Sequence, residues 1–218
     1  MKRIFLKTQR LILRRFTGDD VENLIELDSD PEVMRYLNGG IATPRELIER
    51  ALLPRFLSYY ERYHSLGVWA AIEQSSGSFI GWFSLRPHGE SGHGKAELGY
   101  RLRRSAWGQG YATEGARALI HKGFTEVGLQ RVTANTYEHN SASRRVMEKV
   151  GMTLVRRYRP TLDELTTKTS NHQGPDSVWE GDEVEYALTK EEWEQHTRDV
   201  NTAESILQAG APPVGTDG

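Results

Sequence analysis

Hydrophobic and polar residues alternate along several short segments of the chain, and this period of two is typical of a half-buried β-strand. The expected strands cover residues 10–16, 68–73, 79–85, 96–102, 131–136, 153–155 and 183–188. Between them, apolar residues recur at spacings of three and four, which predicts amphipathic helices. The expected helices cover residues 19–27, 31–37, 44–60, 111–127 and 141–150, and a short one begins at residue 189. This order of elements predicts a mixed sheet with helices packed over it.

A few residues set the ends of these helices. Thr43 can cap a helix whose first turn holds Pro44. Pro54 should kink or divide that helix, because proline lacks the N–H that a helix interior needs. Gly128 can end the 111–127 helix, since glycine readily adopts the left-handed conformation at a helix C-terminus.

The stretch from Trp107 to Thr113 joins an expected strand to the 111–127 helix, and it carries Gly108 and Gly110. The first N–H groups of a helix have no partner within the helix, and they lie at the positive end of its dipole. Glycine has no Cβ, so a ligand can approach the main chain closely. The stretch therefore suits a phosphate or pyrophosphate, and a plain helix start with a flexible entry turn explains it equally well.

Composition and charge exclude several classes of protein. The 218 residues carry a net charge of −2, which argues against a general binder of nucleic acid or of an anionic membrane. The absence of cysteine excludes a disulfide scaffold, a thiolate metal site and a cysteine nucleophile. His88 and His93 share a glycine-rich loop, but no third ligand stands at a persuasive spacing, so we expect no metal. Since no signal peptide or membrane span is recognisable, we expect a cytoplasmic location.

We expect a single domain over residues 1–199 and a disordered tail over residues 200–218, where alanine, glycine, proline and small polar residues prevail. Residues 160–181 are polar and lack periodicity. They predict a long surface loop that is mobile or faces the substrate.

Three segments in order resemble one family. They are Glu97–Tyr100, Trp107–Glu114 and Asn140–Met152. Together they are similar to the GNAT superfamily of acyl-CoA-dependent N-acyltransferases, and most of all to its RimJ/RimL-like branch, whose named members acetylate N-terminal amines of ribosomal proteins. Segments 8–14 and 182–186 fit as well, so the resemblance covers roughly residues 8–195.

The resemblance implies an α/β (α+β) fold with a mixed, mostly antiparallel GNAT-type sheet, a splayed central strand pair and flanking helices. It also implies acetyl-CoA as co-substrate. In the family, the strand before the pyrophosphate loop carries a bulge and diverges from the next strand, and the pantetheine arm pairs with main-chain groups in the gap. By resemblance, the residues that contact the cofactor are Tyr100, Arg101, Leu102, Trp107, Gly108, Gln109, Gly110, Tyr111, Ala112, Thr113, Asn135, Asn140, Ser143 and Arg145. Trp107 stands where the family loop has Gln or Arg, so a main-chain cradle is implied there rather than a side-chain contact.

Transfer to an amine needs a neutral nucleophile, donors for the developing oxyanion and a proton for the departing thiolate. Glu97 is the candidate base, directly or through water, and its alternative role is that of a solvated strand glutamate. Ser143, which the resemblance places near the thioester sulfur, is the candidate proton donor, or else it only supports a helix cap. Tyr100 and Tyr111 are alternative acids, and the Leu102 N–H is a candidate oxyanion donor.

Other polar and aromatic residues allow two interpretations each. Five arginines could contact CoA phosphates or simply form a solvated face: Arg101, Arg103, Arg104, Arg144 and Arg145. Trp82 and Tyr137 could bind the acceptor substrate, together with Trp69, although core packing explains strand aromatics at least as well.

Three functions follow from these observations. The first is an N-acyltransferase that moves an acetyl group from acetyl-CoA directly to a primary amine, either a protein N-terminus or a small molecule. The second is a non-catalytic CoA-binding sensor or scaffold. The third, a Rossmann-type dinucleotide binder, is disfavoured because Thr113 stands at the third glycine position and no βαβ unit with an acidic ribose contact follows. The family suggests a homodimer, and the sequence does not name the acceptor.

Overall fold

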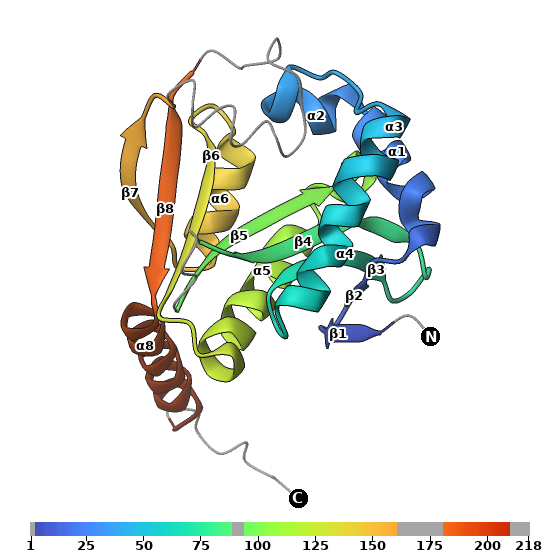
Figure 1. Ribbon diagram of the computed structural model, residues 1–218. Coiled ribbons are helices and arrows are strands. Elements are labelled where there is room, and N and C mark those ends of the chain that lie inside the picture. Colours follow the sequence, from blue (N-terminus) through green and yellow to red (C-terminus); the bar gives the residue numbers. More distant parts are fainter. Residues whose placement is uncertain (1–2, 89–93, 161–180, 210–218) are drawn as a thin grey trace, which may run out of the picture.

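The computed structural model of the chain describes residues 3–88, 94–160 and 181–209. Its centre is an eight-stranded sheet with the order β1-β2-β3-β4-β5-β6-β8-β7 (Figure 1). The strands are β1 (Ile4–Lys7), β2 (Leu11–Arg15), β3 (Gly67–Glu73), β4 (Phe79–Pro87), β5 (Lys95–Leu102), β6 (Arg131–Tyr137), β7 (Thr153–Tyr158) and β8 (Glu183–Thr189). Neighbouring strands are antiparallel, except that β5 and β6 are parallel. The expected mixed, mostly antiparallel sheet is therefore confirmed, and β1 is an additional strand that the sequence pattern did not indicate.

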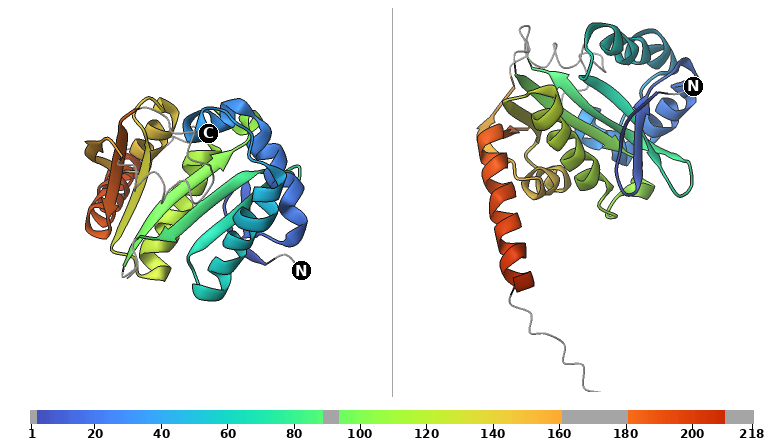
Figure 2. Two further views of the ribbon diagram at one scale, coloured as in Figure 1. Left: turned by 45° about the horizontal axis from the view of Figure 1, so that its top comes forward. Right: turned by 90° about the horizontal axis from the view of Figure 1, so that it is seen from below.

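Helices cover both faces of this sheet (Figures 1 and 2). They are α1 (Val21–Ser29), α2 (Pro31–Asn38), α3 (Arg45–Leu47), α4 (Leu53–Arg62), α5 (Tyr111–Lys122), α6 (Ser141–Lys149) and α8 (Lys190–Ala209). Helices α1 and α4 pack on one face, and α5 and α6 pack on the other. A π-helical turn over Ile48–Leu52 precedes α4, whose first turn holds Pro54, so the predicted division of this helix is confirmed.

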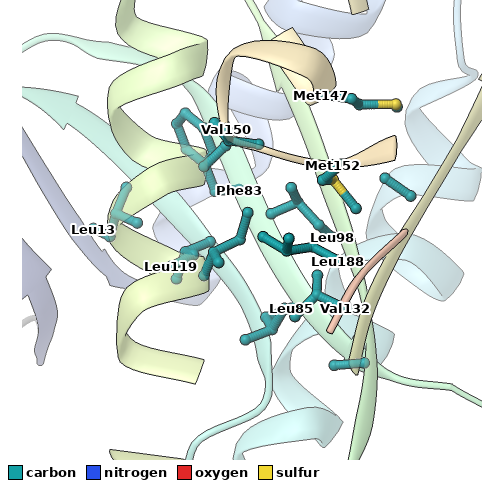
Figure 3. Packing of buried hydrophobic residues seen from close by; sticks show 14 of the residues in the cluster. Leu13, Phe83, Leu85, Leu98, Leu119, Val132, Met147, Val150, Met152 and Leu188 are labelled. Carbon is teal, nitrogen blue, oxygen red and sulfur yellow. The ribbon is translucent and has the colours of Figure 1, made fainter. Parts of the chain in front are cut away.

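Alternate residues of β4 enter two separate cores, because successive side chains of a strand point to opposite faces. Phe83 and Leu85 belong to the core beneath α5, together with Leu119 (Figure 3). Trp82 belongs to the other core, beneath α1 and α4. Helix α5 lies unusually close to the sheet, since a Cβ added at Gly115 would come within 2.3 Å of the Phe83 ring. The close packing of Gly115 on the Phe83 ring sets the distance between α5 and the sheet. It therefore also sets the distance of the α5 N-terminus from β4 and β5.

Two expectations about chain ends and caps were wrong. The Thr43 hydroxyl does not cap a helix but donates a hydrogen bond to the buried carboxylate of Asp28, at 2.9 Å. Helix α8 continues to Ala209, so residues 200–209 are helical, whereas the rest of the expected tail lies outside the described residues. The expected loop over residues 160–181 also falls almost entirely outside them. Within the described ranges, no helix combines the length and apolar composition that a membrane span requires.

A buried ion pair anchors the start of α1 to β2. Both oxygens of Asp20 accept hydrogen bonds from the Arg14 guanidinium, at 2.7 and 2.8 Å. Burial by itself raises the pKa of Asp20, but the hydrogen bonds from Arg14 and Thr17 outweigh it and lower the pKa to about 2.

This pair predicts a specific acid sensitivity. A lowered pKa stabilises the fold above the ordinary pKa of the carboxyl, and the stabilisation is lost as the pH falls from about 5 towards 2. We expect the difference in unfolding free energy between the native protein and Asp20→Asn to shrink by about 2 kcal/mol over that range. Urea unfolding at a series of pH values measures it, and parallel curves for the two proteins would contradict the assignment.

Candidate active site

The central feature of the site is a gap between the parallel strands β5 and β6. Their pairing covers only Lys95–Glu97 and Arg131–Thr133, and it ends at the pair Glu97 and Thr133. Beyond this pair β5 stays bonded to β4, and β6 stays bonded to β8. The facing edges of the two strands are therefore left without a partner strand. The splayed central pair expected for the fold is confirmed.

The ladders on either side determine which main-chain groups face the gap. In an antiparallel pair, alternate residues bond to the neighbour and the others point away. The Arg103 N–H bonds to Ile80 in β4, so the even-numbered residues Tyr100 and Leu102 direct their N–H and C=O groups towards β6. The same reasoning applied to the bond from Glu138 to Asp182 directs the main chain of Asn135 towards β5.

Two details of the expected gap differ from the structure. The register between β4 and β5 runs from Gly81–Leu102 to Pro87–Ala96 without a shift, so β5 diverges from β6 without a bulge in this ladder. The main chain of Arg101 belongs to the ladder with β4 rather than to the gap. Its side chain is buried against Asp28 of α1 in an ion pair, on the face opposite α5, and is not placed to contact a CoA phosphate. The expected cofactor contact of Arg101 is thus corrected.

The loop before α5 exposes a series of main-chain donors. Gly108 and Gly110 have φ angles of 72° and 83°, a conformation that favours glycine. The first helical hydrogen bond runs from the Glu114 N–H to the Gly110 carbonyl. No N–H from Gly108 to Thr113 has an acceptor within the described part of the chain. An open row of donors at the N-terminus of a twelve-residue helix can hold a phosphate group.

The hairpin between β1 and β2 braces this loop. The Glu114 carboxylate accepts hydrogen bonds from Thr8 and from the main chain and side chain of Arg10. Burial by itself raises the pKa of Glu114, but these hydrogen bonds outweigh it and lower the pKa. Arg10 also donates to the Gln109 carbonyl at 2.9 Å. The hairpin therefore holds the loop through a carbonyl group and leaves the N–H groups of the loop without a partner.

Two side chains of the loop bond within the protein. The Trp107 indole donates to the Leu102 carbonyl at 2.9 Å, and the Gln109 amide donates to the Ser105 carbonyl at 2.6 Å. Both bonds shape the turn after β5. A cofactor contact by these two residues would therefore use the main chain, as the sequence implied for Trp107.

A hydroxyl group of helix α6 lies next to a hydroxyl group of strand β5 beside the gap. The Asn140 side chain caps the helix by accepting a bond from the Ser143 N–H at 3.2 Å. The hydroxyl oxygens of Ser143 and Tyr100 lie 2.9 Å apart. Burial raises the pKa of Tyr100 to about 12, so its hydroxyl stays protonated at neutral pH. By contrast, the Tyr111 hydroxyl donates to Glu73 at the end of β3, away from this pair.

Glu97 lies on the opposite face of the sheet and is held by Arg86 of β4. One guanidinium nitrogen, Nη2, lies 2.6 Å from Oε1 of Glu97, and the side chains of both residues are partly exposed. Glu97 is the last β5 residue that pairs with β6, so its carboxylate stands where the gap opens. It is therefore a fixed strand glutamate at the gap rather than a freely solvated one.

The remaining candidate residues are distributed over several places. Trp82 is buried in the core beneath α1 and α4, which is the packing interpretation, and its indole Nε1 has no partner among the described residues. Tyr137 is half-buried at the end of β6, where the gap is open, so its contact with the acceptor stays a prediction. Arg144 is occupied by the Tyr186 hydroxyl and the Glu138 carbonyl. Arg145 is exposed on α6.

The sequence did not indicate Arg86 as a site residue. The available signal was an arginine directly after the apolar strand 79–85. Assigning it required the register that places Arg86 opposite Glu97. Within the described ranges, no group of three histidine or acidic residues is arranged to hold a metal.

Comparison with known proteins agrees with this geometry. Residues 10–153 match the acetyltransferase (GNAT) domain family. The chain is 33% identical over 195 residues to the Aspergillus fumigatus protein named FsC-acetyl coenzyme A-N(2)-transacetylase, an alignment that covers 86% of this chain and 77% of that protein. It is 31% identical over 148 residues to YoaA of Bacillus subtilis, an uncharacterized N-acetyltransferase, with coverage of 67% and 81%.

Solved structures share the fold. A GNAT-family acetyltransferase from Bacillus anthracis superposes with a TM-score of 0.65 at 25% identity, covering 86% of this chain and 99% of its own. RimL, a ribosomal L7/L12 alpha-N-protein acetyltransferase solved in complex with coenzyme A, superposes with a TM-score of 0.67 at 19% identity, covering 86% and 98%. The chain belongs to the GNAT acetyltransferase family.

Proposed function

We propose that this protein transfers an acetyl group from acetyl-CoA directly to a primary amine. One observation carries the proposal. The unpaired edges of β5 and β6 occur together with a loop, directly after β5 in the chain, whose N–H groups have no acceptor. The gap offers main-chain partners to an extended amide-bearing arm, and the loop offers donors to a diphosphate. Tyr100 and Asn135 would hold the arm, because the Leu102 carbonyl already accepts a hydrogen bond from the Trp107 indole. Gly108–Thr113 would hold the diphosphate.

The side chains around the gap suit acyl transfer to nitrogen. Glu97 would take a proton from the attacking amine on one face of the sheet, directly or through water. On the other face, the Tyr100–Ser143 pair would give a proton to the thiolate as the C–S bond breaks and the C–N bond forms. Acetyl-CoA supplies the activated thioester, and an N–H on the gap side of β5, such as that of Leu102, would stabilise the carbonyl oxygen.

The test is release of CoA thiol when the purified protein is given acetyl-CoA and a panel of amines and N-terminal peptides. We expect thiol release that depends on the amine, with an acetylated product of matching mass. If the protein binds CoA but no amine promotes thiol release, the alternative of a CoA-binding sensor or scaffold gains support.

The proton donor can be tested separately. We expect Tyr100→Phe to lower kcat about tenfold, less than a typical loss of general acid catalysis, because the Ser143 hydroxyl would still be available to donate the proton. Ser143→Ala should have a similar effect, and the double variant should lose more than either. A double variant with native kcat would exclude the pair as proton donor, and acetyl-CoA binding by each variant serves as the control.

A further inference from the structure

Three arginines at the end of β5 form ion pairs with residues at the end of α1 and just beyond it. The pairs are Arg101 with Asp28, Arg103 with Glu26 at 2.8 Å and Arg104 with Asp30 at 3.5 Å. The basic run 101–104 allowed two interpretations, as phosphate contacts or as a solvated face, but in the structure each of its guanidinium groups has a carboxylate partner. We refer to the three pairs as the α1 ion-pair cluster.

The cluster extends from the interior of the protein to its surface. Its inner pair is buried, and each outer pair contains one largely shielded side chain, Arg103 with 24% and Asp30 with 27% exposed. The Arg103 guanidinium also lies over the Phe79 ring, 5.3 Å from its centroid. Asp30 also accepts a hydrogen bond from the Glu32 N–H at the start of α2. Because these contacts already hold the two side chains, little conformational entropy is lost when they form ion pairs.

The end of α1 favours cations at this place. The C-terminal carbonyl groups of α1 form the negative end of the helix dipole. The partners of the arginines stand in the last turn of α1 and at its C-cap, Asp30. The dipole therefore adds to the attraction of the three carboxylates. The segment after β5 is bound to α1, and its guanidinium groups are not available to a phosphate.

The proposed diphosphate loop, Gly108–Thr113, begins a few residues after the cluster, and a 3₁₀ turn over Arg104–Ala106 leads into it. The β1–β2 hairpin holds the loop through Arg10, which donates to the Gln109 carbonyl. The α1 ion-pair cluster is a second support, on the β5 side of the loop. The apparent Kd of a ligand rises as the fraction of molecules in the binding-competent conformation falls. Loss of the outer pairs should therefore weaken CoA binding.

The opposite result is expected if the arginines bind the CoA phosphates. Glu26 and Asp30 would then compete with the phosphates for the same guanidinium groups, and their negative charge would repel the cofactor. Removal of either carboxylate would strengthen CoA binding. The sign of the change in Kd therefore distinguishes a positioning role from a phosphate contact.

We infer that Glu26 and Asp30 are positioning residues, which hold the diphosphate loop in its CoA-binding conformation through Arg103 and Arg104. The inference rests on the proposed function, because CoA is the ligand whose binding the two outer pairs would support. It assigns the arginines to the support of the loop, and it leaves the phosphates to the main-chain N–H groups.

The test is isothermal titration calorimetry of CoA with the native protein, with Glu26→Gln, with Asp30→Asn and with the double variant. We expect each single variant to raise the Kd about twofold to fivefold and the double variant to raise it about tenfold, because exposed ion pairs make contributions of this size. Amide hydrogen exchange without ligand gives a second readout. Exchange over residues 103–113 should be faster in the double variant than in the native protein.

Glu22→Gln is the matched control. It removes a carboxylate from the same helix, but the partner of Glu22 is Arg45 of α3 and both side chains are more than half exposed, so the Kd should change less than about twofold. All variants should unfold near the native temperature, because exposed pairs contribute little to stability.

A charge reversal gives an independent check. Glu26→Arg alone should weaken CoA binding, because it places two like charges together and opens the outer pair. Addition of Arg103→Glu should restore most of the affinity, since the pair forms again with the opposite polarity.

Three results would overturn the inference. They are a Kd in the double variant equal to or below the native value, unchanged exchange over residues 103–113, and a charge reversal that binds CoA no better than Glu26→Arg alone. If the native protein binds no CoA, the proposed function fails together with the inference. CoA binding that these variants do not weaken removes the inference alone.

Discussion

Replacing Glu97 by glutamine is expected to lower kcat for acetyl transfer by about 10²-fold to 10³-fold, because a positioned base typically contributes that much. Glutamine keeps the size of the side chain and a hydrogen bond to Arg86, but it cannot take the proton of the amine. The measurement is thiol release at saturating acetyl-CoA with an amine from the panel that reacts. Affinity for CoA should change little, since Glu97 stands at the closed end of the gap.

The pH dependence distinguishes a base from a structural residue. An amine that is already neutral needs less help, so the defect of Glu97→Gln should shrink as the pH rises above the pKa of the amine. That pKa is roughly 8 for an α-amino group and roughly 10.4 for a lysine side chain. A defect that stays constant across this range would assign Glu97 a structural role.

Glu185→Gln is the matched control for this variant. Glu185 is also a strand glutamate held by an arginine, Arg156, at 2.8 Å, but it lies on β8. It should show near-native kcat at every pH. A comparable loss in both variants would mean that broken strand ion pairs, rather than a lost base, explain the effect.

The local parts of the site could be predicted from the sequence. Gly108 and Gly110 lie between a strand and an amphipathic helix, and this order by itself indicates free N–H groups at a helix start. The Asn140 cap is also predictable from local sequence, because the Asn140 side chain and the Ser143 N–H that it accepts from are only three residues apart. In each case the contacts are short in sequence, so residue type and spacing are sufficient.

The contacts between strands and helices could not be predicted in this way. The pairing of Arg86 with Glu97 depends on the register of β4 against β5, and a shift of one residue would turn one of them to the other face. Arg101 was assigned to the cofactor by resemblance to the family, but neither the resemblance nor the basic run that contains it shows which face of β5 its side chain occupies. Its partner Asp28 is 73 residues away in the sequence.

Replacing Asp28 by alanine is expected to lower the free energy of unfolding by about 3–5 kcal/mol, since removal of one partner leaves the other charge buried and unpaired. The Asp28 side chain is 0% exposed, and that of Arg101 is 5% exposed. The Thr43 hydroxyl would lose its acceptor as well. Urea denaturation of the purified variant measures the loss, and Asp28→Asn should recover part of it by keeping the acceptor oxygen for Thr43.

The exposed end of the same helix provides the control. Glu22 pairs with Arg45 at 2.8 Å, but both side chains are more than half exposed, so Glu22→Ala should change the unfolding free energy by less than about 1 kcal/mol. Equal effects of Asp28→Ala and Glu22→Ala would contradict the buried pair. Because Arg101 lies on β5 directly between Tyr100 and Leu102, the loss of Asp28 should also weaken CoA binding, whereas Glu22→Ala should not. A loss of both stability and CoA affinity in Asp28→Ala would show that the ion pair between α1 and β5 keeps β5 in position at the gap.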